Sequence, residues 1–132
     1  MTVATLVDTD ILIDAGKEVP DAVKCLRELQ AGSSIAISTV TELELIVGCR
    51  DKRELRSLDK FLQHFDRVQL NDGISLTATE LLKEYRLSHG LLIPDGLIAA
   101  TAIFMNMPLV SKNQKDYRFI NELKLLPYPM AS

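Results

Sequence analysis

The chain has 132 residues, of which 47% are hydrophobic and 25% are charged, and its formal net charge is −3. These values predict a globular domain rather than a disordered chain, and the negative charge argues against simple nonspecific binding to a polyanion. The N-terminal apolar run ends at Asp8 without a basic flank, and the longest apolar stretch, residues 96–110, is too short and interrupted to span a bilayer. We therefore expect a cytoplasmic protein, in which Cys25 and Cys49 are free thiols.

Short apolar strands alternate with amphipathic helices in the first half of the chain. The expected elements are a buried strand at residues 3–7, a short helix at 11–15, a helix from Pro20 to before Gly32, a strand at 35–37, and a helix from Thr39 to Gly48. Thr39 and Glu42 have the spacing of a capping box, which places the start of the last helix.

The alternation continues in the second half. A helix after Asp51, whose spacing to Glu54 again matches a capping box, has an expected inner face formed by Leu55, Leu58, Phe61, Leu62 and Phe65. The remaining expected elements are a strand at 68–70, a turn at 71–73, a helix at 74–89, a helix from Pro94, a strand at 109–111, a short helix at 117–123 and an edge strand at 125–126.

Strands that alternate with helices predict an α/β fold. We expect a mainly parallel sheet of four to five strands, with helices on both faces. Ligands of such sheets bind beyond the carboxyl ends of the strands. Residues at those ends are therefore the first candidates for a functional site.

Four acidic residues follow the predicted strands or open the helices after them. They are Asp8, Glu42, Asp95 and Asp116. Clusters of carboxylate oxygens hold hard divalent cations such as Mg²⁺ or Mn²⁺. Their common position at one sheet edge therefore predicts a metal site.

Each acid also has a simpler interpretation when it is taken alone. Asp8 and Asp116 could each cap the helix that follows. Glu42 could be the second half of its capping box, and Asp95 would gain stabilisation from the helix dipole in a first turn. One shared site accounts for all four positions at once, and we favour it.

Four segments in this order resemble the motifs of a known family: VDTDILID from Val7, TELEL from Thr41, PDGLIAATA from Pro94 and SKNQKDY from Ser111. They are similar to the PIN-domain ribonucleases, and most similar to the VapC toxins of bacterial and archaeal toxin–antitoxin pairs. The resemblance runs over essentially the whole chain, which implies a single PIN-like domain at residues 1–132 with three layers.

The resemblance implies roles for individual residues. The catalytic and metal-binding residues would be Asp8, Glu42, Asp95 and Asp116, with Asp8 and Asp95 the surest ligands. Ser111 and Asn113 match the family's Thr/Ser-x-Asn element and would order the ligands or the attacking water. The chain departs from the family pattern at Asp10, where Asn is frequent, and at Gly96, where a helix-forming residue is commoner.

The implied activity is that of a metal-dependent endoribonuclease toxin. Such an enzyme would use one or two Mg²⁺ or Mn²⁺ ions to activate water and to stabilise charge on the phosphate. By the same resemblance, the target is a structured RNA such as a tRNA or a ribosomal RNA loop. A cognate VapB-type antitoxin would hold the toxin inactive, and the toxin would be a homodimer, with the helices between Arg50 and Phe65 as one candidate interface.

Basic residues fall into two groups. Lys112, Lys115 and Arg118 surround Asp116 and are candidate contacts for RNA phosphates. The second group, between Arg50 and Lys60, has acidic neighbours and is expected to be a solvated helix face. The two histidines, His64 and His89, fall outside the motifs and are expected to be structural.

Two other classes of protein are alternatives to a metal-dependent ribonuclease. A phosphoacceptor receiver domain would fit Asp8, Asp10 and Lys112 loosely, but its phosphoacceptor should end a central strand, whereas Asp51 opens a charged helix. A PIN-like module that only binds RNA or protein is the second alternative, and the presence of all four acids weighs against it. Metal-dependent RNA cleavage distinguishes the three.

Overall fold

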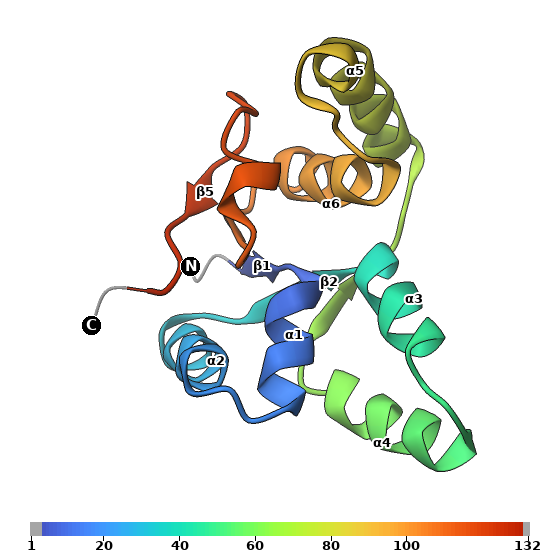
Figure 1. The fold of residues 1–132 in the computed structure, drawn as a ribbon, viewed down its shortest axis with the longest axis vertical. Helices are drawn as coiled ribbons and strands as arrows, with labels where there is room; N and C mark the ends of the chain where they lie inside the picture. Colours follow the sequence, from blue (N-terminus) through green and yellow to red (C-terminus); the bar gives the residue numbers. More distant parts are fainter. Residues whose placement is uncertain (1–3, 131–132) are drawn as a thin grey trace.

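The computed structural model describes residues 4–130 and contains a five-stranded sheet in the order β3-β2-β1-β4-β5 (Figure 1). The strands are β1 (Thr5–Val7), β2 (Ile35–Ser38), β3 (Asp66–Val68), β4 (Leu109–Val110) and β5 (Leu125–Leu126). All neighbouring strands pair in parallel. The predicted parallel α/β sheet is therefore confirmed, although Val3 of the expected first strand lies outside the described residues.

Helices cover both faces of this sheet. They are α1 (Thr9–Gly16), α2 (Pro20–Gly32), α3 (Thr39–Val47), α4 (Lys52–Leu62), α5 (Asp72–His89) and α6 (Ile93–Phe104), followed by the short 3-10 helix η1 (Gln114–Asp116). Figure 1 shows α5 and α6 on one side of the sheet, and α1, α2 and α4 on the other. Each face has its own buried apolar cluster, so the three predicted layers are confirmed. No helix within residues 4–130 is long and apolar enough to cross a membrane.

The order of the strands creates a topological switch point at the carboxyl ends of the central strands. β2 and β3 lie on one side of β1, whereas β4 and β5 lie on the other. The order in which strands are added to the sheet therefore reverses between β1 and β4. Val7 is in register with Val110 at the carboxyl ends of these two strands. Ligands of open parallel sheets bind at such a switch point. Asp8 and Ser111, the residues that follow the two strands, lie there.

Two predicted capping boxes differ from the structure. Ser38, the last residue of β2, caps α3 by accepting a hydrogen bond from the Val40 amide, whereas the Thr39 hydroxyl donates to the Val68 carbonyl. Thr39 is therefore the first helical residue and links α3 to β3. At α4 the predicted Asp51 cap is confirmed, because its side chain accepts from the Glu54 amide, but Glu54 accepts from the Arg50 amide instead of completing the box.

Other details of the predicted elements also differ from the structure. β3 lies at Asp66–Val68 rather than at 68–70, and Leu55 of the expected inner face of α4 is exposed. Residues 117–123 form successive turns instead of a helix, with the amides of Ile120 and Leu123 donating to the carbonyls three residues earlier. Tyr117, Ile120 and Leu123 are all buried. This spacing of three imitates a helical face, which explains the wrong prediction. Cys25 and Cys49 are free, as expected.

Candidate functional site

Asp8 joins the two central strands through both of its carboxylate oxygens. Oδ1 accepts a hydrogen bond from the Thr9 amide at 2.8 Å, so Asp8 is the N-cap of α1. Oδ2 accepts from the Ser111 hydroxyl at 2.7 Å, across from β4. Asp8 is only 6% exposed. The capping role proposed for Asp8 is therefore real, but it uses one oxygen and leaves the other at the switch point.

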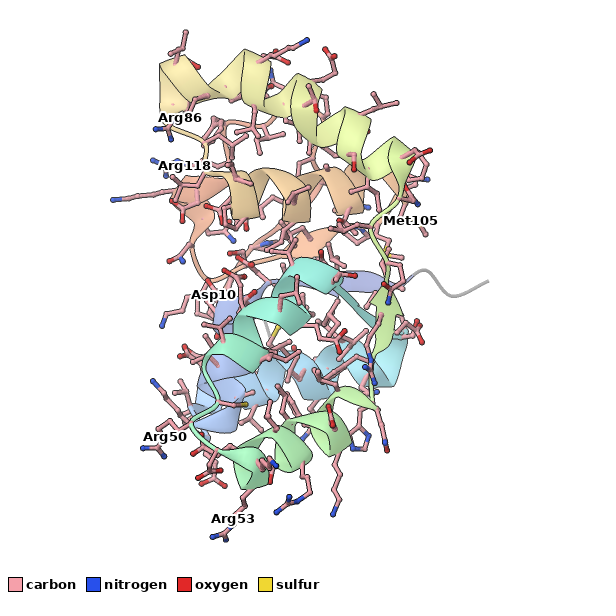
Figure 2. All side chains as sticks on the ribbon, turned by 90° about the vertical axis from the view of Figure 1, so that its right-hand side faces the viewer. Asp10, Arg50, Arg53, Arg86, Met105 and Arg118 are labelled. Atoms are coloured by element: carbon pink, nitrogen blue, oxygen red, sulfur yellow. The ribbon has the colours of Figure 1, made fainter. Side chains whose placement is uncertain are left out.

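Asp10 lies beside Asp8 and is held by the turn after β4. Its Oδ2 accepts from the Asn113 amide at 3.1 Å, and Oδ1 lies 3.4 Å from the Lys112 amide. The Ser111 hydroxyl is 3.4 Å from Oδ2. Asp10 belongs to the first turn of α1, and Figure 2 shows it at the end of that helix nearest α6. The segment from Ser111 to Asn113 thus positions two adjacent carboxylates.

Tyr117 links Asp95 to the position of Asp8 and Asp10. Its hydroxyl donates to Asp95 Oδ1 at 3.2 Å, and it also lowers the pKa of Asp8 through a hydrogen bond. The ring is 1% exposed, and burial raises the pKa of its hydroxyl, followed by the charges of Asp8 and Asp95. The hydroxyl therefore stays a donor. Tyr117 was not among the predicted site residues, and the only indication in the sequence is that it follows Asp116 in the SKNQKDY motif.

The acidic residue of α3 that faces this place is Glu44, not Glu42. The Thr9 hydroxyl donates to Glu44 Oε1 at 2.6 Å, and the charge of Glu44 raises the pKa of Asp95. Glu42 Oε2 instead accepts from Arg67 Nη1 at 2.9 Å, on β3. The expectation that Glu42 belongs to the site is corrected accordingly.

Helix geometry explains why Glu44 rather than Glu42 turns toward Asp8 and Asp95, and the sequence contains the pattern that indicates it. Val40 and Thr41 are the buried residues of α3, and residues three or four positions apart share a helix face. Glu44 is four residues after Val40 and three after Thr41, so it follows them on the helix side that turns toward α1, although its side chain stays exposed. Glu42 is turned about 100° away from Thr41 and reaches the edge strand.

Burial and the charges of neighbouring carboxylates raise pKa values in this group of acids. Burial raises the pKa of Asp8 to about 7, with the Asp10 charge adding to the rise. Burial also raises the pKa of Asp10. For Asp95 the causes in order are burial and then the Asp116 charge, with smaller contributions from Glu44 and Asp10. We call these five residues, Asp8, Asp10, Glu44, Asp95 and Asp116, the acidic cluster.

The chemistry of the acidic cluster fits a hard divalent cation. All its side chains supply oxygen donors, and a cation would relieve the repulsion that adds to the raised pKa values of Asp8 and Asp95. Within residues 4–130, however, no three of the acids already surround one position suitable for an ion. Binding would therefore have to draw the side chains together. Asp8 is held by Ser111, and Asp95 is held by Tyr117.

Basic side chains flank one side of the acidic cluster. Lys112, Lys115 and Arg118 line a hollow of about 450 Å³ together with Asp116. Lys112 Nζ is also paired with Asp14 Oδ2 at 2.9 Å. Arg50 and Arg53 lie at the other end of the molecule from Arg118 (Figure 2). Arg50 there pairs with Glu54 at 2.8 Å, in agreement with a solvated helix face.

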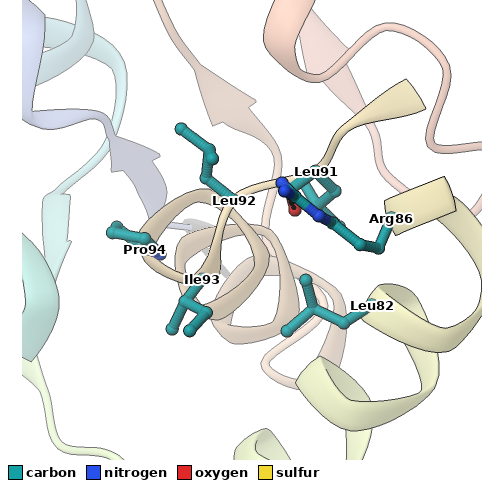
Figure 3. A pocket seen from close by; sticks show the side chains of 6 residues that line it. All are labelled: Leu82, Arg86, Leu91, Leu92, Ile93 and Pro94. Carbon is teal, nitrogen blue, oxygen red and sulfur yellow. Dashed lines mark hydrogen bonds between the residues drawn. The ribbon is translucent and has the colours of Figure 1, made fainter.

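Apolar side chains flank the acidic cluster on another side. A hollow of about 550 Å³ at the junction of α5 and α6 is lined by Leu82, Arg86, Leu91, Leu92, Ile93 and Pro94 (Figure 3). A second hollow of about 340 Å³ is lined by Val40, Leu43, Glu44, Val47 and Pro94. The two hollows share Pro94, and the exposed side chains around it include Val47 (84% exposed) and Ile93 (66% exposed). This surface has the composition of a protein contact rather than of a catalytic site.

Comparison with known proteins relates this geometry to a family. Residues 5–121 match the PIN domain. Ribonuclease VapC1 of Methanocaldococcus jannaschii is 32% identical over 93% of this chain and 85% of that protein. Ribonuclease VapC19 of Mycobacterium tuberculosis is 33% identical over 90% of this chain and 96% of that protein.

Solved structures of similar fold come from toxin–antitoxin complexes. A chain of VapBC2 from Rickettsia felis, bound to a DNA fragment from the promoter, has a TM-score of 0.80 and 29% identity, covering 92% of this chain and 96% of its own. A chain of a toxin–antitoxin complex from Klebsiella pneumoniae has a TM-score of 0.79 and 28% identity, covering 97% and 99%.

Proposed function

This chain belongs to the PIN-domain family, and we propose that it is a VapC-type toxin that cleaves RNA with the help of Mg²⁺ or Mn²⁺. The observation that carries the proposal is the convergence of acids from the ends of three elements, with the pKa values of Asp8 and Asp95 raised by burial and by the charges of neighbouring acids. The relatives named VapC ribonucleases support the same activity. We take residues 1–132 as one PIN-like domain.

The residues of the acidic cluster have distinct roles in this proposal. Asp8 and Asp95 hold the metal, with Glu44 and Asp116 completing the ligands directly or through water. A bound divalent cation supplies a water of lowered pKa and neutralises charge on the attacked phosphate. Ser111 orients Asp8, and Tyr117 orients Asp95 by donating a proton in a hydrogen bond. Asp10, fixed by the Asn113 amide, keeps the negative charge of the cluster high.

The substrate that we propose is a structured RNA, such as a tRNA or a ribosomal RNA loop. Loops present unstacked nucleotides that a shallow site can reach. Lys115 and Arg118 supply the phosphate contacts, since Asp116 of the acidic cluster lines the same hollow. These contacts position the backbone without reading the sequence of bases.

The partner that we propose is a VapB-type antitoxin, which holds the toxin inactive in the cytoplasm. The support is the fold shared with chains of toxin–antitoxin complexes, in Rickettsia felis and Klebsiella pneumoniae. An antitoxin that covers the acidic cluster would exclude RNA from it.

A homodimer is the assembly that we propose, through the surface around Pro94 rather than through the helices between Arg50 and Phe65. Leu92 and Ile93 protrude beside hollows on both sides of Pro94. Protrusions and hollows on one surface suit an isologous contact, in which the same surface of each copy faces the other.

Cleavage assays test the proposed activity. The purified chain should cut RNA when Mg²⁺ or Mn²⁺ is added and should stop in EDTA. Asp95→Asn should lose cleavage, whereas Asp59→Asn, a change of an exposed acid on α4, should not. RNA binding without cleavage under any of these conditions would favour a module that only binds, and cleavage that persists in EDTA would exclude the metal mechanism.

A further inference from the structure

A small hollow adjoins the acidic cluster on the side of α5. It measures about 160 Å³, and its lining includes His89, Leu92, Asp95, Lys115, Asp116 and Phe119. Pockets that enclose a whole small ligand measure about 300–1,000 Å³, whereas a water molecule takes about 30 Å³. The hollow is therefore suited to one flat group of a larger ligand. It shares two of its residues, Asp95 and Asp116, with the acidic cluster.

Aromatic rings form one side of this hollow, and they are held in place. The His89 imidazole stacks on Phe119, with ring centroids 4.4 Å apart and planes inclined by 8°. Tyr85 contacts both rings edge-on, at 6.0 Å from His89 and 5.4 Å from Phe119. Ser88 Oγ lies 2.8 Å from His89 Nδ1. The imidazole is thus exposed and yet fixed from two directions, so little side-chain freedom is lost when a ligand packs there.

The hollow adjoins the basic hollow lined by Lys112, Lys115 and Arg118. Lys115 and Asp116 line both. A chain of phosphates that follows Lys115 and Arg118 would therefore reach the acidic cluster at the point where the aromatic side of the hollow begins. Phosphate contacts, a metal site and an aromatic surface then lie in the order that a single-stranded nucleic acid requires.

We propose that this hollow is a nucleobase subsite, which receives the base of a nucleotide next to the cleaved phosphate. The subsite rests on the proposed function, since it matters for catalysis only if a phosphodiester is cut at the acidic cluster. The base packs against His89 and Phe119, and Lys115 contacts the adjoining phosphate. His89 is therefore a substrate-positioning residue and not a structural one, in contrast to what its place outside the sequence motifs indicates.

Two conservative variants test the subsite in cleavage. His89→Gln and Phe119→Leu remove an aromatic ring but keep a side chain of similar size, and Leu87→Ala, at a 98% exposed position of the same helix end, is the matched control. The substrate is a short single-stranded RNA of random sequence, with the ends of the products sequenced. Because stacking of one base contributes about 1–3 kcal/mol, KM should rise about ten-fold or more in both variants, with kcat nearly unchanged.

The nucleotide preference beside the cleaved bond is a second readout. It would not change if His89 and Phe119 only stabilised the fold. The nucleotide preference beside the cleaved bond should weaken in His89→Gln and Phe119→Leu and stay as in the wild type in Leu87→Ala. A wild-type KM together with wild-type product ends in both ring variants would overturn the subsite, while RNA cleavage itself would still stand.

Binding of mononucleotides decides the case in which no RNA is cleaved. The four nucleoside 5′-monophosphates are titrated with Ca²⁺ present, and the NMR signals of the His89 ring and of the Gly90 and Leu91 amides are followed. Saturable shifts that disappear in His89→Gln and Phe119→Leu support the subsite even if the proposed nuclease activity fails. Signals that do not move with any of the four nucleotides overturn it.

Discussion

The Thr9 hydroxyl donates to Glu44 Oε1 across 2.6 Å, and this hydrogen bond joins the first turn of α1 to α3. Thr9 also donates its amide to Asp8, so the same residue contacts two carboxylates of the acidic cluster. The Thr41 hydroxyl lies 3.0 Å from that of Thr9 and keeps it aimed toward α3. Glu44 is thus positioned by α1, whereas Glu42, two residues earlier, is held by Arg67 at the sheet edge.

The first prediction compares these two glutamates. Glu44→Gln should lower kcat/KM for RNA by about 10–100-fold, as changes of groups around a metal commonly do. Glu42→Gln should leave kcat/KM close to the wild-type value, because it removes only a partly buried ion pair with Arg67 at the edge of the sheet. Steady-state kinetics at saturating Mn²⁺ measures both. The opposite ranking of the two variants would return Glu42 to the site and remove Glu44.

The alternation of strands and helices could be predicted from the sequence because it depends on local patterns. Buried parallel strands such as Ile35–Ser38 are short apolar runs, and proline at the start of α2 and glycine after α5 mark helix ends. The turns at residues 117–123 could not be predicted in this way, since their apolar spacing is shared with a helix. Only packing of Tyr117 between Asp8 and Asp95 distinguishes the two.

The acids at strand ends could be predicted because parallel strands bring their carboxyl ends together, which places Asp8 beside the turn at Ser111. The choice between Glu42 and Glu44 depends instead on the rotation of α3 about its axis. That rotation is set by the burial of Val40 and Thr41 against other elements. A pattern of alternating acids, as in TELEL, does not contain this information unless the inner face is assigned first.

The second prediction concerns pH and the metal-free protein. The pKa of Asp8 is about 7 in the folded state and 3.8 as the ordinary value, so the folded state binds more protons between these values. The stability that this group contributes is fully present below pH 3.8 and is lost as the pH rises through about 7. The raised pKa values of Asp10 and Asp95 act in the same direction.

Urea unfolding in EDTA between pH 5 and pH 8 measures this effect. The free energy of unfolding should fall as the pH rises, and Asp8→Asn should flatten the decrease, whereas Asp59→Asn should retain the wild-type slope. A decrease equally steep in Asp8→Asn would show that other groups cause it.

The third prediction concerns the basic hollow. Lys115→Ala and Arg118→Ala should each weaken RNA binding and reduce the slope of log K against log salt by about 0.7–0.9, the value for one lost phosphate contact. Arg53→Ala, at the far end of the molecule, is the matched control (Figure 2). Fluorescence anisotropy over a range of salt concentrations gives the slopes. Unchanged slopes in both hollow variants would place the RNA elsewhere.

The fourth prediction concerns assembly. Val47→Glu and Ile93→Glu introduce a charge into the exposed apolar surface around Pro94 and should convert the dimer to a monomer, because a buried unpaired charge is costly. Met105→Glu changes an exposed apolar side chain at the other end of α6 and should leave the assembly unchanged (Figure 2). Light scattering after gel filtration gives the masses. Dimers that persist in both surface variants would exclude this interface.

The fifth prediction distinguishes a metal site from a set of helix caps by stability alone. If Asp8 and Asp95 only cap their helices or interact with the helix dipole, Asp→Asn at either position should be neutral or mildly destabilising. Added metal should then leave the melting temperature unchanged. If they belong to one crowded anionic site, either change should be neutral or stabilising without metal, since it removes a repulsive charge.

Added Mg²⁺ or Mn²⁺ should then raise the melting temperature of the wild type, because a ligand that binds only the folded state stabilises it. At a metal concentration near 100 Kd the gain is about 2.7 kcal/mol. Asp8→Asn and Asp95→Asn should gain much less, and Glu42→Gln, which alters an acid held by Arg67, should gain as much as the wild type. Equal shifts in all four proteins over a millimolar titration would mean that the ions bind elsewhere, and the acidic cluster would lose its role as a metal site.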